Sequence, residues 1–215
     1  MDFVVLKSLF YGLNEAFAKQ ALLLCGADAC LGDHSDVYCQ AQERYLYCLS
    51  RKKIKHYPSR ILLHADEYCS FLVFLARQAH LRGCDSLAEI AYLVNRRLHA
   101  FECFYTRSMP DVFHLEHPVG SVLGQAVFGE YLVVYQGVSV GGDMSLRYPE
   151  VGEGVALFAK SSVIGRAVIG DNCAVGVGVQ VYGARVAAHM AVSSRGQSGF
   201  VASPMNWSVK ERFFK

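Results

Sequence analysis

The spacing of hydrophobic residues divides the sequence into two halves. From Asp2 to about Tyr105, apolar residues recur every three or four positions, as on one face of an α-helix. Turn residues interrupt this spacing at positions 26–33, 57–59 and 82–86. The first half is therefore predicted to be a set of α-helices.

A six-residue period replaces the helical spacing after Pro110. We interpret each unit as a short strand followed by a tight turn, and three units as one triangular coil of a β-helix. In each six-residue unit, one large apolar side chain points into the interior of this triangular prism, and a smaller side chain follows four positions later. An antiparallel sandwich would instead alternate every second residue. The large positions are Phe128, Val134, Val140, Val151, Leu157, Val163, Ile169, Val175 and Val181, and the smaller ones are Leu132, Val138, Val155, Ser161, Ala167, Cys173 and Val179.

The period is interrupted once. Eleven residues separate Val140 from Val151, whereas other neighbouring repeat positions are six apart. Because a regular prism has no place for the extra residues, positions 141–150 are predicted to form a projecting loop. Such loops on a rigid scaffold often carry function, although a simple surface insertion is the alternative.

Composition and charge narrow the class of protein. The chain has 215 residues, 53% hydrophobic, so it can bury a substantial core. With 21 basic and 19 acidic residues and no long run of like charge, neither nucleic acid nor membrane is an expected partner. Lys7 and Asn14 interrupt the first apolar stretch, so no export signal is predicted and a cytoplasmic location is expected.

The cysteines do not indicate a metal site. There are eight, without CxxC spacing, and the sequence has no HExxH motif. Reduced, largely buried thiols are expected in the absence of an export signal.

Three segments of the second half resemble serine acetyltransferases. They are EHPVGSVLG at 116–124, YQGVSVGG at 135–142 and RYPEVGEGV at 147–155. They are similar to the family patterns DH..G..(V/I)GE, (Y/L)Q(G/S)VTLGG and RHP.(I/L)G.GV, in the same order. The resemblance implies an α+β fold, with a helical N-terminal domain (1–108), a left-handed parallel β-helix of hexapeptide repeats (109–192) and a tail (193–215).

The resemblance also implies the chemistry. His117 corresponds to the family's catalytic base, which takes a proton from an acceptor hydroxyl as it attacks acetyl-CoA. Glu116 replaces an aspartate that helps to bind the acceptor, and Arg147 matches the arginine that holds the acceptor's carboxylate. Tyr148 replaces a second active-site histidine, so the identity of the acceptor is open. Asp111 is the nearest upstream carboxylate and a candidate to orient His117.

Acetyl-CoA is the co-substrate that the resemblance implies, and no metal is expected. The positions that match the family's CoA-binding residues are Gly141, Gly142 and Ala159, and Lys160 is a candidate partner for a CoA phosphate. The family forms trimers with CoA sites between neighbouring prisms. A homotrimer is therefore expected, with a hexamer possible, together with a small-molecule acceptor.

Alternative functions remain open at this point. A sugar acceptor, on which Tyr148 would stack, and an inactive β-helix trimer are both compatible with the sequence. A zinc enzyme of the carbonic anhydrase type is disfavoured because His114 and His117, three residues apart, cannot point the same way along a strand. Family tails that insert into the next enzyme of cysteine synthesis often end in Ile, whereas residues 212–215 here are RFFK. We therefore do not expect that complex, and expect Trp207, Phe213 and Phe214 to pack on the helical domain or on a neighbour.

Overall fold

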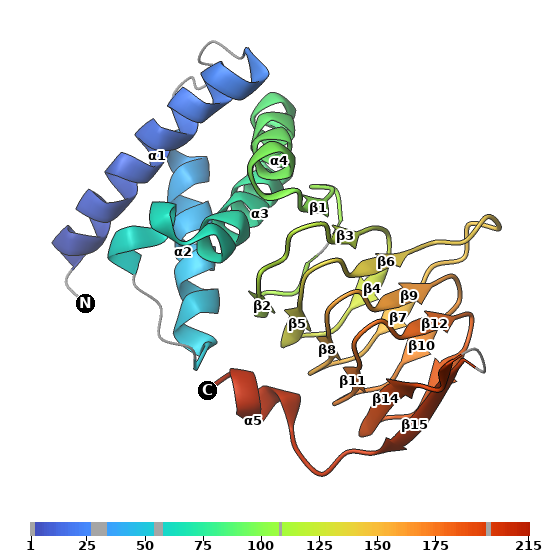
Figure 1. The fold of residues 1–215 in the computed structure, drawn as a ribbon. Coiled ribbons are helices and arrows are strands. Elements are labelled where there is room, and N and C mark those ends of the chain that lie inside the picture. Colours follow the sequence, from blue (N-terminus) through green and yellow to red (C-terminus); the bar gives the residue numbers. More distant parts are fainter. Residues whose placement is uncertain (1–2, 27–33, 54–57, 108, 197–198) are drawn as a thin grey trace.

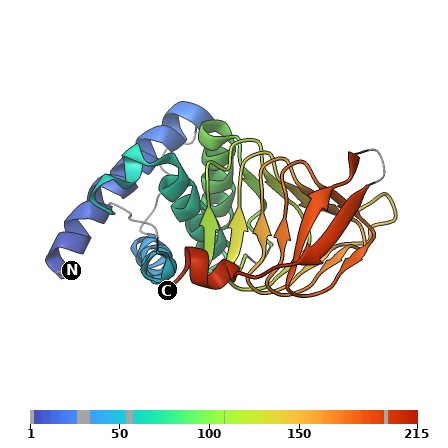
Figure 2. The same ribbon diagram turned by 60° about the horizontal axis from the view of Figure 1, so that its bottom comes forward.

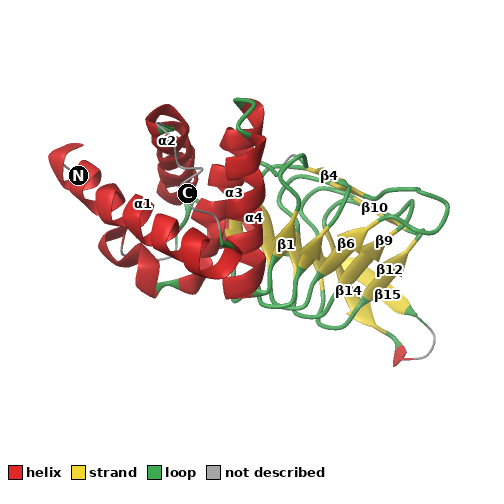
Figure 3. Cartoon of the chain, turned by 90° about the horizontal axis from the view of Figure 1, so that it is seen from above, coloured by secondary structure: helices red, strands yellow, loops and turns green. Residues whose placement is uncertain are grey.

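The computed structural model describes residues 3–26, 34–53, 58–107, 109–196 and 199–215. Its helices gather at one end of a prism of strands (Figures 1 and 3). This arrangement confirms the predicted fold class, a helical region followed by a parallel β-helix. The helices of the first half are α1 (Phe3–Cys25), α2 (Ser35–Arg51), the 3₁₀ helix η1 (Pro58–Leu63), α3 (Ala65–Leu81) and α4 (Asp85–His99).

Helix α3 is the centre of the helical part. Its residues 67–76 are all buried, because α2 and α4 pack on it and it also lies against the β-helix. Helix α4 ends where Ala100 adopts a left-handed conformation (φ 50°) and donates its N–H to the carbonyl of Arg96. None of the helices in the described part of the chain is long and apolar enough to cross a bilayer.

The β-helix consists of three sheets whose strands pair in parallel from coil to coil. The first sheet has the order β1 (Glu102–Cys103), β3 (Val122–Leu123), β6 (Ser139–Gly141), β9 (Ser162–Ile164), β12 (Gln180–Tyr182). The second has β4 (Val127–Phe128), β7 (Glu150–Val151), β10 (Val168–Ile169), β13 (Arg185–Val186). The third has β2 (Phe113–Leu115), β5 (Leu132–Val134), β8 (Ala156–Leu157), β11 (Ala174–Val175), β14 (Met190–Ser194) and β15 (Phe200–Pro204), of which only the last pairs antiparallel.

The predicted repeat positions stack in this prism. Phe128 pairs with Val151, Val134 with Leu157 and Val140 with Val163. Of the nine large positions, Phe128 is partly buried and the others are fully buried, and the smaller positions are buried as well. Glycine follows Phe128 because a Cβ on Gly129 would lie 2.5 Å from backbone atoms of the next coil.

The projecting loop is confirmed. Residues 142–149 leave the prism between β6 and β7 and extend beyond the coils, drawn in yellow in Figure 1. Strand β1 already pairs with β3, so the first coil begins at Glu102, before the boundary predicted at residue 108. A strand of two residues is too short to show a period in sequence.

A segment that we call the strap, residues 205–215, returns from the last coil to the helical part (Figure 2). It contains α5 (Val209–Phe213) and covers the outer face of the third sheet. Next to α5, Phe214 forms a β-bridge with Lys52 at the end of α2. The Phe214 ring itself packs against Tyr131 of the β-helix, in one apolar cluster with Trp207 and Phe213. The expected packing of these aromatic side chains on the helical part is therefore not found, and the contact with the end of α2 is made by backbone groups.

One helical histidine gives a pH prediction. Burial lowers the pKa of His99 to about 4, against about 6.5 for an unfolded chain. As the pH is lowered, His99 is therefore protonated in the unfolded state before it is protonated in the folded state. The free energy of unfolding falls between about pH 6.5 and pH 4, by about 3 kcal/mol at most. Above pH 6.5 the His99 ring is neutral in both the folded and the unfolded state, and it no longer makes stability depend on pH. Urea unfolding from pH 7.5 to 4.5 is expected to show a smaller acid loss for His99→Gln than for wild type, and parallel curves would contradict this.

Candidate active site

The candidate base lies on an irregular corner of the prism. Eight residues separate Leu115 from Leu123, whereas six separate Val134 from Val140 in the next coil, so the corner between β2 and β3 holds two extra residues. His117 occupies this bulge in a left-handed conformation, with φ 49°. Such backbone is uncommon for a residue other than glycine and is often found at functional sites.

Two carboxylates flank the imidazole of His117. The carboxylate oxygen Oδ2 of Asp66 lies 3.4 Å from Nδ1 and also accepts the backbone N–H of His117 at 3.1 Å. On the other side, Oε1 of Glu116 lies 3.6 Å from Nε2. The His117 side chain is 74% exposed in the single chain, so it remains accessible to a ligand.

The carboxylate next to Nδ1 of His117 is not the one that the sequence suggested. Asp111 forms an ion pair with Arg44 of α2, so the suggestion that it orients His117 is wrong. Asp66, in the first turn of α3, takes that position. The sequence could not identify it, because an acidic residue in a first helical turn usually indicates only favourable interaction with the helix dipole.

Glu116 has a second partner. Its Oε2 lies 2.6 Å from Nε2 of His114, whose side chain is 3% exposed. Burial lowers the pKa of His114, which favours the neutral ring. A neutral imidazole can donate one hydrogen bond to Glu116, and the carboxylate is thereby held between two histidines.

A buried ion pair lies in the helical part beside this site. Glu67 follows Asp66 in α3, and both of its carboxylate oxygens are 3.3–3.4 Å from Nζ of Lys52. Tyr45 donates its hydroxyl to the same carboxylate at 2.9 Å, and burial raises the pKa of that phenol. The side chains of Lys52 and Glu67 are 1% and 7% exposed, so the pair is shielded from water.

Arg147 lies in the projecting loop, and Asp143 fixes its side chain. The carboxylate oxygen Oδ2 of Asp143 accepts a hydrogen bond from Nε of Arg147 at 2.8 Å and lies 2.7 Å from Nη2 of the same guanidinium. The other oxygen, Oδ1, accepts hydrogen bonds from the backbone N–H groups of Ser145 and Arg147. The guanidinium in turn holds the pKa of Asp143 below its usual value. Arg147 is therefore preorganised, with part of its fork still facing solvent.

Tyr148 packs on the glycine pair at the start of the loop. A Cβ on Gly142 would lie 2.8 Å from the Tyr148 ring, so the ring requires glycine there, whereas the space around Gly141 is open. Lys160 has a left-handed backbone (φ 60°), and its N–H bonds to the carbonyl of Gln136. It follows Ala159 in the turn between β8 and β9.

The predicted site residues lie on two edges of the prism in one chain. His117, Glu116, Ala159 and Lys160 are at the corner where the third sheet turns into the first. Gly141, Gly142, Arg147 and Tyr148 are at the corner where the first sheet turns into the second. A single chain thus separates the candidate base from the candidate carboxylate-binding arginine.

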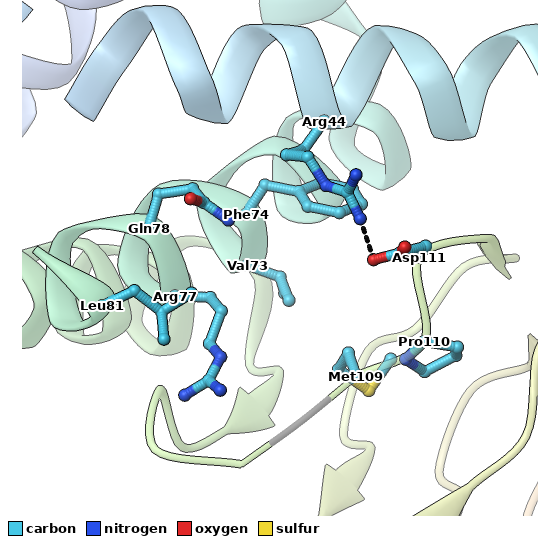
Figure 4. A pocket seen from close by; sticks show the side chains of 9 residues that line it. All are labelled: Arg44, Val73, Phe74, Arg77, Gln78, Leu81, Met109, Pro110 and Asp111. Atoms are coloured by element: carbon cyan, nitrogen blue, oxygen red, sulfur yellow. Dashed lines mark ion pairs between the residues drawn. The ribbon is translucent and has the colours of Figure 1, made fainter. Parts of the chain in front are cut away.

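A cavity of about 340 Å³ lies elsewhere, between α2, α3 and the segment before β2 (Figure 4). The Arg44–Asp111 ion pair lies at one side and Arg77 at another. Asp111 lines it, but His117, Glu116 and Arg147 do not, so we do not place the chemistry there. Its lining is Arg44, Val73, Phe74, Arg77, Gln78, Leu81, Met109, Pro110 and Asp111.

Comparison with known proteins supports the resemblance. The chain is 32% identical over 120 residues to serine acetyltransferase from Staphylococcus xylosus, covering 54% of this chain and 56% of that protein. It is 35% identical over 68 residues to the enzyme from Synechococcus elongatus, covering 30% and 28%. The structure of Neisseria gonorrhoeae serine acetyltransferase matches with a TM-score of 0.64 at 20% identity, over 81% of this chain and 69% of that one.

The chain is a serine acetyltransferase-like hexapeptide-repeat protein. A second solved structure, serine acetyltransferase isoform 3 from Entamoeba histolytica in complex with cysteine, has the same fold, with a TM-score of 0.61 at 17% identity over 91% of this chain and 70% of that one. No family model matches the sequence. This serine acetyltransferase-like chain spans between about a quarter and just over half of the curated relatives named above.

Proposed function

We propose that the protein is an acyltransferase that moves the acetyl group of acetyl-CoA to the hydroxyl of serine or a related small hydroxy amino acid. The observation that carries the proposal is the geometry at His117, an accessible imidazole between Asp66 and Glu116 on a serine acetyltransferase-like scaffold. The similarity to serine acetyltransferases supports the class of reaction.

His117 supplies the general base in this reaction. Oδ2 of Asp66, 3.4 Å from Nδ1, favours the tautomer with its proton on Nδ1, so the lone pair of the neutral imidazole is on Nε2. Nε2 removes the proton of the acceptor hydroxyl while the oxygen attacks the thioester carbonyl. The tetrahedral intermediate then collapses, the C–S bond breaks, and the imidazolium returns its proton to the CoA thiolate. Asp66 stabilises the transient imidazolium.

A complete site requires a second copy of the chain in this proposal. Arg147 is on another edge of the prism from His117, so the arginine that meets the acceptor carboxylate belongs to a neighbouring copy. A homotrimer, as the resemblance implies, brings such edges together. Acetyl-CoA then lies between prisms, near Gly141 and Gly142 of one copy and Ala159 and Lys160 of another.

A second acceptor class is favoured by two observations on the loop. Asp143 already pairs with two nitrogens of Arg147, which weakens the attraction for a carboxylate. Tyr148, with 38% exposure, also offers an aromatic ring to a sugar. Transfer to a sugar hydroxyl or amine is therefore the alternative.

Thiol release from acetyl-CoA with a panel of acceptors separates these functions. We expect turnover with L-serine or another hydroxy amino acid, and we expect Arg147→Gln to raise the KM for that acceptor about tenfold to a hundredfold with a smaller effect on kcat. The matched control is Arg185→Gln, an exposed arginine of the second sheet, which leaves KM unchanged. Turnover only with amino sugars would favour the alternative, and none with any acceptor would contradict both.

A further inference from the structure

The outer face of the third sheet is apolar where it lies beside the candidate base. His114, Val133 and Ala156 point outward from β2, β5 and β8, because the residues on either side of each contribute to the prism core. The strap covers this face. Its Phe213 ring stacks on the His114 ring with centroids 6.2 Å apart and planes at 29°.

The strap is fixed on both sides of Phe213. Before it, the N–H of Val209 donates to Oδ1 of Asn172 at 2.9 Å. After it, the N–H of Lys215 donates to the carbonyl of Arg51 at 2.6 Å, and Phe213 itself accepts the N–H of Lys53 at 2.9 Å. The ring over His114 is therefore held by contacts with both the β-helix and α2.

His114 connects the strap to the candidate active site. It lies 2.6 Å from Oε2 of Glu116, while the other oxygen of the same carboxylate is 3.6 Å from Nε2 of His117. A glutamate side chain has several rotamers, so without a fixed partner its carboxylate would sample positions away from His117. The short hydrogen bond to the buried His114 ring restricts the Glu116 carboxylate to one position.

We infer that His114, held under Phe213 of the strap, is a positioning residue that keeps the Glu116 carboxylate beside the Nε2 atom of His117. This inference rests on the proposed function and adds to it a role for a segment far from the family motifs. Neither His114 nor Phe213 contacts the proposed reacting atoms, so both act only through Glu116.

Three single variants test the inference. His114→Phe keeps a ring under Phe213 but removes the donor, and Phe213→Ala removes the cover. Val209→Ala removes apolar volume from the same strap and leaves both rings of the His114–Phe213 stack in place. We expect the first two to lower kcat about tenfold to a hundredfold while the KM for acetyl-CoA changes little. Val209→Ala is expected to lower the melting temperature and to leave kcat unchanged at a temperature where the protein is folded.

A double variant shows whether the effect passes through Glu116. If it does, His114→Phe has no further effect on kcat once Glu116→Gln is present. Additive losses, or an equal loss of kcat in Val209→Ala, would overturn the inference and leave a general stabilising role for the strap.

A measurement without turnover keeps this test separate from the proposed function. The NMR signal of the His117 ring is expected to shift in His114→Phe and Phe213→Ala and to stay in place in Val209→Ala. An unchanged signal in all three variants would reject the positioning role even in an active enzyme. Absence of activity in wild type with every acceptor, with the signal shifting as expected, would reject only the proposed function.

Discussion

Replacement of His117 by alanine is expected to lower kcat for acetyl transfer by a factor of about 10² to 10⁴, with little change in the KM for acetyl-CoA. The variant loses the atom that accepts the hydroxyl proton, and the flanking Asp66 and Glu116 lie beside that atom rather than in its place. The measurement is steady-state release of free CoA thiol with the acceptor identified from the panel.

His189→Ala is the matched control. His189 also has a left-handed backbone at a corner of the β-helix, with φ 62°, so the two substitutions place alanine in the same unfavourable conformation. It lies at the turn after β13, on another edge than His117. We expect this control to keep full kcat. Undiminished thiol release by His117→Ala would remove the histidine from the mechanism.

Replacement of Lys52 by methionine is expected to destabilise the protein by about 3–5 kcal/mol. The substitution keeps the apolar stem but leaves the buried Glu67 carboxylate without the ammonium group that faces it at 3.3 Å. Urea unfolding at one fixed protein concentration gives the change in free energy, since association of copies would otherwise contribute.

Two further variants show whether the loss of stability in Lys52→Met comes from the unpaired Glu67 charge. In Lys52→Met with Glu67→Gln, both charges are absent, and we expect much of the lost stability to return. Lys19→Met breaks an exposed pair with Glu15 on α1 and is expected to leave stability nearly unchanged. A loss in Lys52→Met no larger than in Lys19→Met would show that the buried pair contributes nothing to folding.

The β-helix could be predicted from sequence because its signal is local. Each coil repeats the same short unit, so Val134, Leu157 and Val175 show their common role through spacing alone. The loop after β6 was equally visible as an interruption of that spacing. The short strand β1, by contrast, has no period of its own and follows directly after α4.

The candidate site could be predicted only in part. The motif around His117 identified the base and Glu116, but Asp66 is 51 residues earlier and meets His117 only because α3 packs on β2. The role of His114 was missed for a related reason, since its cover, Phe213, comes from the strap. Contacts between distant segments leave no spacing signal, and those between copies of a chain leave none either.

The bond between Lys53 and the carbonyl of Glu211 joins residues 158 positions apart and has a consequence for biosynthesis. A ribosome makes the helices first and the strap last, so the end of α2 and the face that carries His114 remain uncovered while the coils between them are made. The strap can close over both only after the prism exists to bring it back. Maturation of the candidate active site is therefore among the last events in the folding of a newly made chain.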